Sequence, residues 1–286
     1  MSSVLVTGGA GFIGSALCER LVELGHRVTS IDNYSNGDIR NHHEGVEYHT
    51  LESHQLRSLF DPSDFDYIYH LGEYSRVEQS FDDFNKVMEY NYHAFPHVVN
   101  FANDGNCKLI YSGSSTKFAV EGNGKSMSPY AYTKAQNTEY LKAFSQWNDL
   151  NHVIVYFYNV YGDHERSNGK YATVVGKFLR MYQEGAHSLP VTYPGTQLRN
   201  FTHIDDVVDG LYIAGFEGYG DGYGIGHDSK FSILELTDMF DLEADMMPPA
   251  HGNRMDGELN SKKLKDLGWE AKRNLYDYIE DRIFES

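Results

Sequence analysis

The sequence predicts an α/β protein in which a doubly wound parallel sheet carries helices on both faces and a smaller C-terminal lobe follows. Two observations predict this fold class. Short apolar runs typical of buried strands alternate with segments of helical apolar spacing through about the first 160 residues. A glycine-rich turn joins the first of these runs to the first helical segment. The expected strands span residues 4–6, 28–31, 46–49, 67–71, 109–111 and 153–157.

The first strand and the first helix meet at residues 8–14, which read Gly-Gly-Ala-Gly-Phe-Ile-Gly. Val4 to Val6 precede this segment, and helical apolar spacing from Ile13 to Leu24 follows it. Glycines allow a tight turn and let backbone N–H groups approach a pyrophosphate, which the positive end of the helix dipole stabilises. The next strand ends at Asp32, eighteen residues after Gly14. This is about the spacing of a carboxylate that binds an adenosine ribose, so the segment predicts a Rossmann-type dinucleotide site rather than a surface turn.

After Gly162 the sequence becomes more polar and richer in glycine. Helices are expected over residues 173–182, 205–216 and 233–240. We therefore expect a dinucleotide-binding Rossmann domain over residues 1–162, to which segments near 200–226 return. Residues 163–286 form the expected smaller, substrate-binding lobe.

Composition excludes several classes of protein. The net charge of −17 and the pI near 5.1 argue against a nucleic-acid partner, which usually requires a basic surface. The chain contains no run of 18 apolar residues and no leader-like start before Val4, so we expect a cytoplasmic protein without a membrane partner. The 14 histidines show no ligand spacing, and no metal site is expected. Cys18 and Cys107 lie in apolar patterns typical of packing residues.

A candidate catalytic group lies between the fifth expected strand and the helix after it. Tyr130 and Lys134 are four residues apart and share one face of a helix that Ser128-Pro129 can begin. A nearby ammonium favours the phenolate form of a tyrosine, which makes it a usable base. Taken alone, this pair is a common surface feature. A hydroxyl-rich turn over residues 111–116, which includes Ser114, can bind the same substrate oxygen, and the combination is more specific than either part.

The chain resembles the extended short-chain dehydrogenase/reductase family, in particular its nucleotide-sugar epimerase and dehydratase branch. The resemblance covers nearly the whole chain. The motifs stand in the family's order: residues 7–14, Asp32-Asn33, His70-Leu71-Gly72, Asn91, 112–116, Tyr130 with Lys134, 158–162, Arg199-Asn200-Phe201 with Ile204 and Asp206, and Leu267-Gly268-Trp269.

The resemblance implies a role for each matching residue. Tyr130 is the acid/base, Lys134 binds the nicotinamide ribose and tunes Tyr130, and Ser114 binds the reacting sugar hydroxyl. The other residues implied to contact NAD are Gly8, Gly11, Phe12 and Ile13 at the pyrophosphate, Asp32 and Asn33 at the adenosine ribose, and Leu71, Gly72, Asn91 and Tyr158 at the nicotinamide half. Asn159, Arg199 and Arg254 match positions that bind the diphosphate of a nucleotide sugar, and a guanidinium can bind two phosphate oxygens at once. A homodimer is also usual in the family.

The residues also favour one of the family's reactions. Asp32 favours NAD, because a carboxylate would repel the 2′-phosphate of NADP. Related dehydratases and decarboxylases carry a carboxylate just beyond the catalytic hydroxyl, whereas residues 115–119 here read Ser-Thr-Lys-Phe-Ala. Neither cysteine is placed for epimerisation at C3 or C5. We therefore expect epimerisation at C4, with a nucleotide-sugar oxidoreductase or dehydratase, or a non-catalytic NAD-binding sensor or scaffold, as alternatives.

Several residues depart from the family pattern. Glu73 occupies a position that usually holds a small residue, and is expected either to contact the sugar or to cap the next helix. Lys117-Phe118-Ala119, Tyr156 and Asp163 also differ from common family residues. These positions are expected near the sugar and base pockets, where they would affect the choice of nucleotide sugar.

Overall fold

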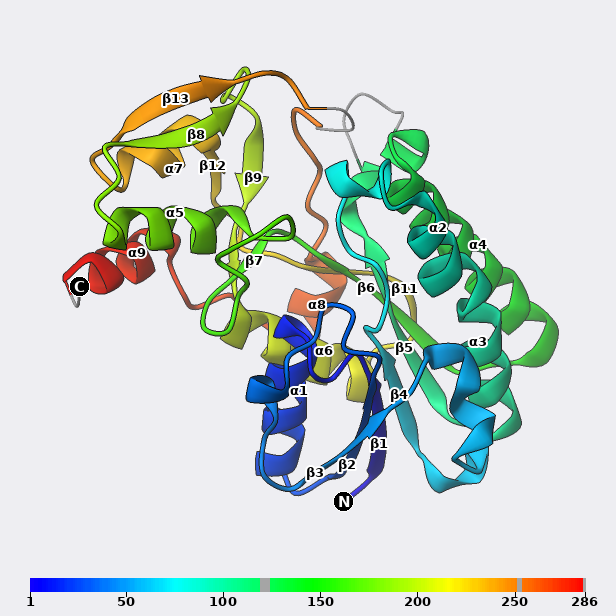
Figure 1. Cartoon of the computed structure of the whole chain (residues 1–286). Helices are drawn as coiled ribbons and strands as arrows, with labels where there is room; N and C mark the ends of the chain where they lie inside the picture. The colour runs from blue at the N-terminus through cyan, green and yellow to red at the C-terminus, as the bar shows by residue number, and fades with distance from the viewer. Residues whose placement is uncertain (119–123, 251–253, 285–286) are drawn as a thin grey trace.

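A seven-stranded parallel sheet forms the centre of the molecule, in the order β3-β2-β1-β4-β5-β6-β11 (Figure 1). The computed structural model describes residues 1–118, 124–250 and 254–284. The strands are β1 (Ser3–Thr7), β2 (Arg27–Asp32), β3 (Val46–Thr50), β4 (Tyr67–His70), β5 (Lys108–Ser114), β6 (His152–Phe157) and β11 (Gly220–Ile225). The predicted α/β fold class with a doubly wound parallel sheet is confirmed.

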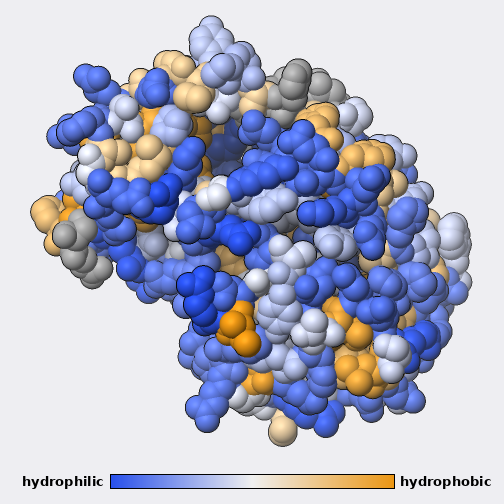
Figure 2. Space-filling view, in the orientation of Figure 1, coloured by the Kyte–Doolittle hydropathy of each residue, from blue (hydrophilic) through white to orange (hydrophobic). Residues whose placement is uncertain are grey.

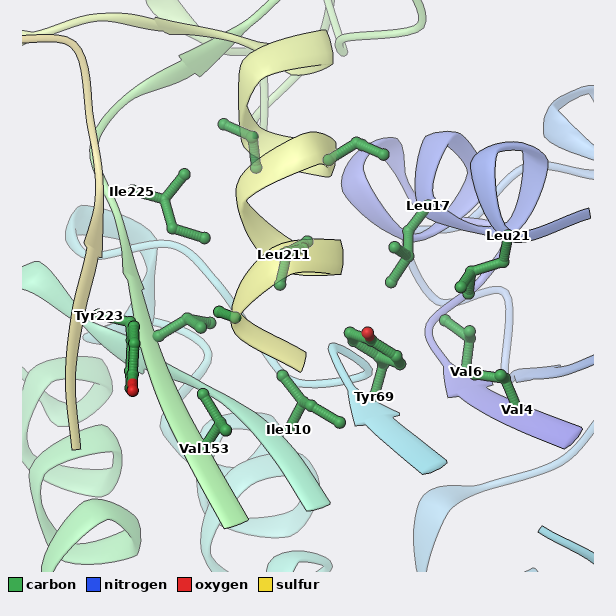
Figure 3. Close-up of a cluster of buried hydrophobic side chains, with 14 of the residues drawn as sticks. Val4, Val6, Leu17, Leu21, Tyr69, Ile110, Val153, Leu211, Tyr223 and Ile225 are labelled. Carbon is green, nitrogen blue, oxygen red and sulfur yellow. The ribbon is translucent and has the colours of Figure 1, made fainter. Parts of the chain in front are cut away.

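Helices cover both faces of this sheet (Figure 1). On one face lie α1 (Phe12–Glu23), α6 (Ile204–Glu217) and the short α8 (Lys262–Asp266). Figure 3 shows Val4 and Val6 of β1 close to Leu17 and Leu21 of α1, while Leu211 of α6 lies nearer to Tyr69 of β4 and Ile110 of β5. On the other face, α3 (Phe95–Asp104) and α4 (Pro129–Asn148) enclose a second apolar cluster. Burial of these apolar faces stabilises the three-layer arrangement.

The C-terminal half builds a separate apolar cluster around Phe178, Leu236 and Phe240. Its elements are α5 (Val174–Gln183), β8 (Ser188–Thr192), α7 (Ile233–Asp238), β13 (Glu243–Met247) and α9 (Leu275–Phe284). Strand β13 pairs with β8 in parallel, and β12 (Lys230–Ser232) pairs with β9 (Leu198–Asn200) in antiparallel fashion. The short strands β7 (Val160–Tyr161) and β10 (Thr202–His203) pair in parallel. Helix α6 and strand β11 pack with the central sheet, whereas α5 before them and α7 after them belong to the C-terminal cluster. The chain therefore crosses between the sheet and this cluster more than once.

The start of α4 follows local capping chemistry. The hydroxyl of Ser128 accepts a hydrogen bond from the backbone N–H of Ala131 at 3.1 Å, and Pro129 is the first helical residue. Ser at the N-cap and Pro directly after it are the residues that favour this position. Tyr130 and Lys134 therefore lie one turn apart at the beginning of the helix.

Both cysteines are buried and carry no disulfide. Burial raises the pKa of the Cys107 thiol to about 11 and that of Cys18 further still. The thiolate is the nucleophilic form, so neither side chain is prepared to react. Within the part of the chain that the structure describes, no helix has the length and apolar character to cross a membrane.

Candidate active site

A cavity of about 680 Å³ opens at the carboxyl ends of the central strands and appears as a hollow between the two parts of the molecule (Figure 2). Ligands of doubly wound sheets bind at this edge. The predicted site residues that line the cavity are Gly8, Gly11, Phe12, Ile13, Asp32, Asn33, Leu71, Gly72, Ser114, Tyr130, Lys134, Asn159, Arg199 and Arg254. The structure thus brings together residues from five strand ends, from α4 and from the C-terminal half.

The glycine-rich turn is shaped for close approach. Gly8 has a φ of +75°, and an added Cβ would lie 2.8 Å from the Cα of Gly72. The backbone N–H of Gly72 donates to the Thr7 hydroxyl at 3.0 Å, which holds the ends of β1 and β4 together. Gly11 precedes α1 and provides no side-chain cap, so the helix N-terminus remains available to a pyrophosphate.

Asp32 is 7% exposed at the end of β2. Its carboxylate oxygens accept hydrogen bonds from the backbone N–H groups of Ala10 at 3.0 Å and Tyr34 at 2.8 Å. Burial raises the pKa of this carboxyl group, and these two N–H groups oppose that rise. Because Asp32 is fixed and still lines the cavity, its position fits recognition of a ribose hydroxyl. The turn and this carboxylate together fit an NAD dinucleotide.

The predicted catalytic residues lie on adjacent elements around the same cavity. Ser114 ends β5, and its hydroxyl lies 2.8 Å from the hydroxyl of Thr116. Tyr130 lines the cavity from the first turn of α4. The Lys134 ammonium donates to the backbone carbonyl of Ser112 at 2.6 Å, which anchors α4 to the end of β5.

Glu73 lines the cavity, but its carboxylate binds buried groups of the protein and does not cap a helix. Its carboxylate forms an ion pair with Lys134, and the side chains are only 1% and 4% exposed. Asn137 donates to Oε1 of Glu73 at 2.9 Å, and the Tyr111 hydroxyl lies 3.3 Å from Oε2. Burial raises the pKa of Glu73, but Lys134 and His70 oppose it and the net pKa is lowered. The following 3₁₀ turn, Glu78–Ser80, has Val77 as its N-cap residue and no side-chain cap.

Two residues expected at the nicotinamide do not line the cavity. Asn91 is fully buried in a π-helical turn over Met88–His93, where its side chain bonds the backbone N–H of Tyr74 at 2.7 Å and the carbonyl of Tyr74 at 3.1 Å. Tyr158 donates its hydroxyl to the carbonyl of Glu258 at 2.7 Å. Side chains alternate in direction at the end of β6, so Phe157 lines the cavity while Tyr158 packs into the sheet's apolar cluster.

Four of the departing residues, Lys117, Phe118, Tyr156 and Asp163, do not line the cavity, contrary to expectation. The ammonium of Lys117 contacts the hydroxyl of Tyr156, and that hydroxyl donates to Asp221 on β11 at 2.6 Å. Lys117 and Tyr156 therefore bind each other and Asp221 outside the cavity. Asp163 is exposed and pairs with Arg282. Ala119 lies outside the described residues.

Two arginines form one wall of the cavity. The guanidinium of Arg199 donates to the backbone carbonyl of Arg254 at 2.7 Å, and that of Arg254 donates to the carbonyl of Ser115 at 2.5 Å. Residues from distant parts of the chain thus gather positive charge at the cavity, close to the hydroxyl-rich turn after β5. Such an arrangement suits a diphosphate.

Arg76 is a cavity residue that the sequence analysis did not identify. Its Nε and one terminal nitrogen donate to the carbonyl of Tyr171 at 3.0 and 2.7 Å. The signal for it was its position in the loop that follows β4, since residues after parallel strands face this edge of the sheet. Among the described residues, no group of three or more His, Cys, Asp or Glu side chains could hold a metal ion.

Glu165 in the loop before α5 should make stability depend on pH. Burial raises its pKa from an ordinary 4.5 to about 7, against the opposing hydrogen bonds from the Thr173 hydroxyl and the Gly162 N–H. The folded chain therefore holds this proton where the unfolded chain has lost it, and stability falls as pH rises from 4.5 to about 7. Replacing Glu165 with Gln should raise Tm at pH 8 by roughly 5 °C and leave it nearly unchanged at pH 4. Calorimetry at both pH values checks this, and an equal effect at both would contradict it.

Comparisons with known proteins identify the family and the fold of the chain. The model of the "NAD dependent epimerase/dehydratase family" matches residues 4–223. A UDP-N-acetyl-alpha-D-glucosaminuronate decarboxylase of Bacillus cytotoxicus is 28% identical, over 82% of this chain and 77% of that protein. The UDP-glucose 4-epimerase of Bacillus subtilis is 25% identical, over 98% of this chain and 95% of that protein. The solved UDP-glucose 4-epimerase of Thermotoga maritima superimposes with a TM-score of 0.89 at 24% identity, over 99% of this chain and 97% of that chain.

Proposed function

The chain belongs to the NAD dependent epimerase/dehydratase family, and we propose that within it the protein epimerises a nucleotide-diphosphate sugar at C4 through a transient 4-keto sugar. The observation that carries the proposal is the joint position of Ser114, Tyr130 and Lys134 around the cavity that fits NAD. The adjoining residues 115–118 add hydroxyls, a lysine and a phenylalanine but no carboxylate. A hydride acceptor, one phenol and one hydroxyl are all that C4 epimerisation requires.

In this reaction bound NAD supplies reversible hydride acceptance at C4 of the sugar. The phenol oxygen of Tyr130 takes the proton of the 4-hydroxyl, directly or through Ser114, and returns it after the sugar has turned over. Lys134, held by Glu73 and by the carbonyl of Ser112, lies one helical turn from Tyr130 and would bind the nicotinamide ribose. Asn159, Arg199 and Arg254 hold the diphosphate while the sugar presents its other face. The net reaction consumes no cofactor, because the hydride and the proton both return to the sugar.

The proposed substrate is a nucleotide-diphosphate sugar because of the arginine wall. Arg254 is 9% exposed, so its charge is largely removed from water and suits an anionic partner. Several relatives are named for nucleotide sugars, with glucose, glucosaminuronate and other sugars among them. We place the protein in the cytoplasm, as the sequence predicts.

The reaction is tested by NMR of the purified protein with UDP-, GDP-, CDP- and dTDP-sugars and catalytic NAD. Conversion of one sugar into its C4 epimer without net NADH is the expected result. Accumulation of NADH would instead indicate an oxidoreductase, and loss of water a dehydratase. Failure to convert any of the sugars would favour a non-catalytic NAD-binding protein.

We also propose that two copies of the chain associate through the outer face of α2 (Phe84–Val87) and α4. Phe84 is 51% exposed and Tyr132 is 47% exposed, and both line a shallow cavity of about 310 Å³ with Phe81 and Met88. Exposed aromatic patches of this kind mark protein interfaces. Light scattering should show a dimer that becomes a monomer when Phe84 is replaced with Asp. A monomeric wild-type protein at micromolar concentration would contradict the proposal.

A further inference from the structure

The ion pair between Glu73 and Lys134 places the negative charge of a carboxylate in contact with the ammonium of Lys134, one of the proposed catalytic residues. A lysine in a surface salt bridge is mostly solvated, whereas the side chains of Lys134 and Glu73 are almost fully buried. Burial of two charges is costly unless each has further hydrogen-bond partners. Glu73 has them in Asn137 and Tyr111, and Lys134 has the carbonyl of Ser112.

A chain of contacts connects this pair to the cofactor turn. Oε1 of Glu73 lies 3.5 Å from Nε2 of His70, and Nδ1 of His70 lies 2.7 Å from the hydroxyl of Thr7. That hydroxyl also accepts the N–H of Gly72, next to Gly8. The carboxylate of Glu73 therefore couples α4 to the strand ends beneath the glycine-rich turn. A displaced carboxylate would release the ammonium of Lys134 from its present place.

The pair also changes the charge around Tyr130. A lone ammonium would favour the phenolate, but the carboxylate of Glu73 offsets much of that charge. Arg76 supplies a further positive charge to the cavity wall that Tyr130 also lines. Its guanidinium donates hydrogen bonds to the backbone carbonyls of Tyr171 and Ser75 and to the Ser75 hydroxyl, and within residues 1–118, 124–250 and 254–284 it forms no ion pair with a carboxylate.

We propose that Glu73 is a positioning residue that fixes the ammonium of Lys134 and offsets its charge, so that Glu73 and Arg76 together set the pH at which Tyr130 becomes a base. This inference rests on the proposed role of Tyr130. The charged and titratable groups that face Glu73 are Lys134 on α4, His70 at the end of β4 and Tyr111 on β5. The charged and titratable neighbours of Arg76, in the loop after β4, are Tyr74, Tyr130, Glu165 and Arg166.

The sign of the effect follows from the charges. Replacing Glu73 with Gln removes a negative charge, so the phenolate should form more readily. The acid limb, which is the rise of kcat with pH on the acidic side of the profile, should then move about one pH unit lower. Replacing Arg76 with Gln removes a positive charge and should move the limb in the opposite direction. Glu73→Asp keeps the charge and should leave the limb in place while it lowers kcat, because the shorter side chain holds Lys134 less well.

Glu47→Gln is the matched control. It removes one carboxylate from the edge strand β3, where Glu47 is 69% exposed, and should leave the profile unchanged. Unmoved limbs in Glu73→Gln and Arg76→Gln would overturn the proposal. A limb that moves equally in the Glu47 variant would also overturn it, because the effect would then be one of overall charge.

A second measurement does not require turnover. The ultraviolet absorbance of phenolate is followed during titration of the wild type and of Tyr130→Phe, and the difference isolates Tyr130. The same difference measured in the Glu73→Gln background should appear at lower pH. If no nucleotide sugar is converted, the proposed function fails, while this titration still decides the electrostatic role of Glu73.

Discussion

Replacing Tyr130 with Phe should lower turnover by about 10³-fold, which is the typical contribution of a general acid/base. The substitution removes one hydroxyl from the first turn of α4 and leaves the Lys134 contacts with Glu73 and Ser112 in place. The glycine-rich turn and Asp32 are also unchanged, so NAD should remain bound. Turnover is measured with the sugar found in the NMR screen, and retained NAD by chromatography of the denatured protein.

Tyr140→Phe is the control for this substitution. Tyr140 lies on the same helix, but it packs against the apolar cluster that α3 and α4 enclose with the sheet, and it does not line the cavity. Its loss of a hydroxyl should leave turnover near the wild-type value. A Tyr130 variant as active as the Tyr140 variant would remove Tyr130 from the mechanism.

Replacing Lys134 with Met should destabilise the protein by about 3 kcal/mol, because it leaves the carboxylate of Glu73 buried without its cation. The effect differs from that of a surface ion pair, whose loss costs at most about 1 kcal/mol. The double variant Lys134→Met with Glu73→Gln removes both charges and should recover much of the loss. Urea unfolding of the four proteins in this cycle measures the coupling between the two side chains.

The exposed pair of Lys262 and Asp266 on α8 offers a comparison within the same chain. Its side chains are 77% and 61% exposed, and the same cycle there should give a coupling near zero. A Lys134 variant that unfolds at the wild-type urea concentration would show that the carboxylate of Glu73 is readily protonated or hydrated. In that case the ion pair could not be a fixed part of the site.

Apolar runs were sufficient to predict the first six strands of the sheet. Five of them, β1, β2, β4, β5 and β6, are buried between two helical layers, whereas the edge strand β3 has no fully buried residue. The seventh strand, β11, has no such pattern, since it contains Gly220, Gly222 and Gly224. Its conformation depends on pairing with β6 and on close packing, and an added Cβ at Gly224 would collide with the carbonyl of Asn260. Contacts of this kind depend on tertiary structure and leave little trace in local sequence. The division of the chain at residue 162 remains a prediction.

The candidate site shows the same distinction. Tyr130, Lys134, Ser114 and Asp32 could be predicted because motif spacing and strand ends determine where they lie. The role of Glu73 could not, since its partners at positions 70, 111, 134 and 137 come together only in the folded chain. The side-chain directions of Asn91 and Tyr158 likewise depend on a π-helical turn and on alternation at the end of β6.

The central claim is that hydride leaves C4 and returns to it within one bound complex. The most direct test uses the nucleotide sugar found in the NMR screen, labelled with deuterium at C4, and follows the label in the product. The C4 epimer should keep its deuterium, and no NADH should accumulate. Replacement of the label by hydrogen from water, or release of labelled NADH, would contradict it.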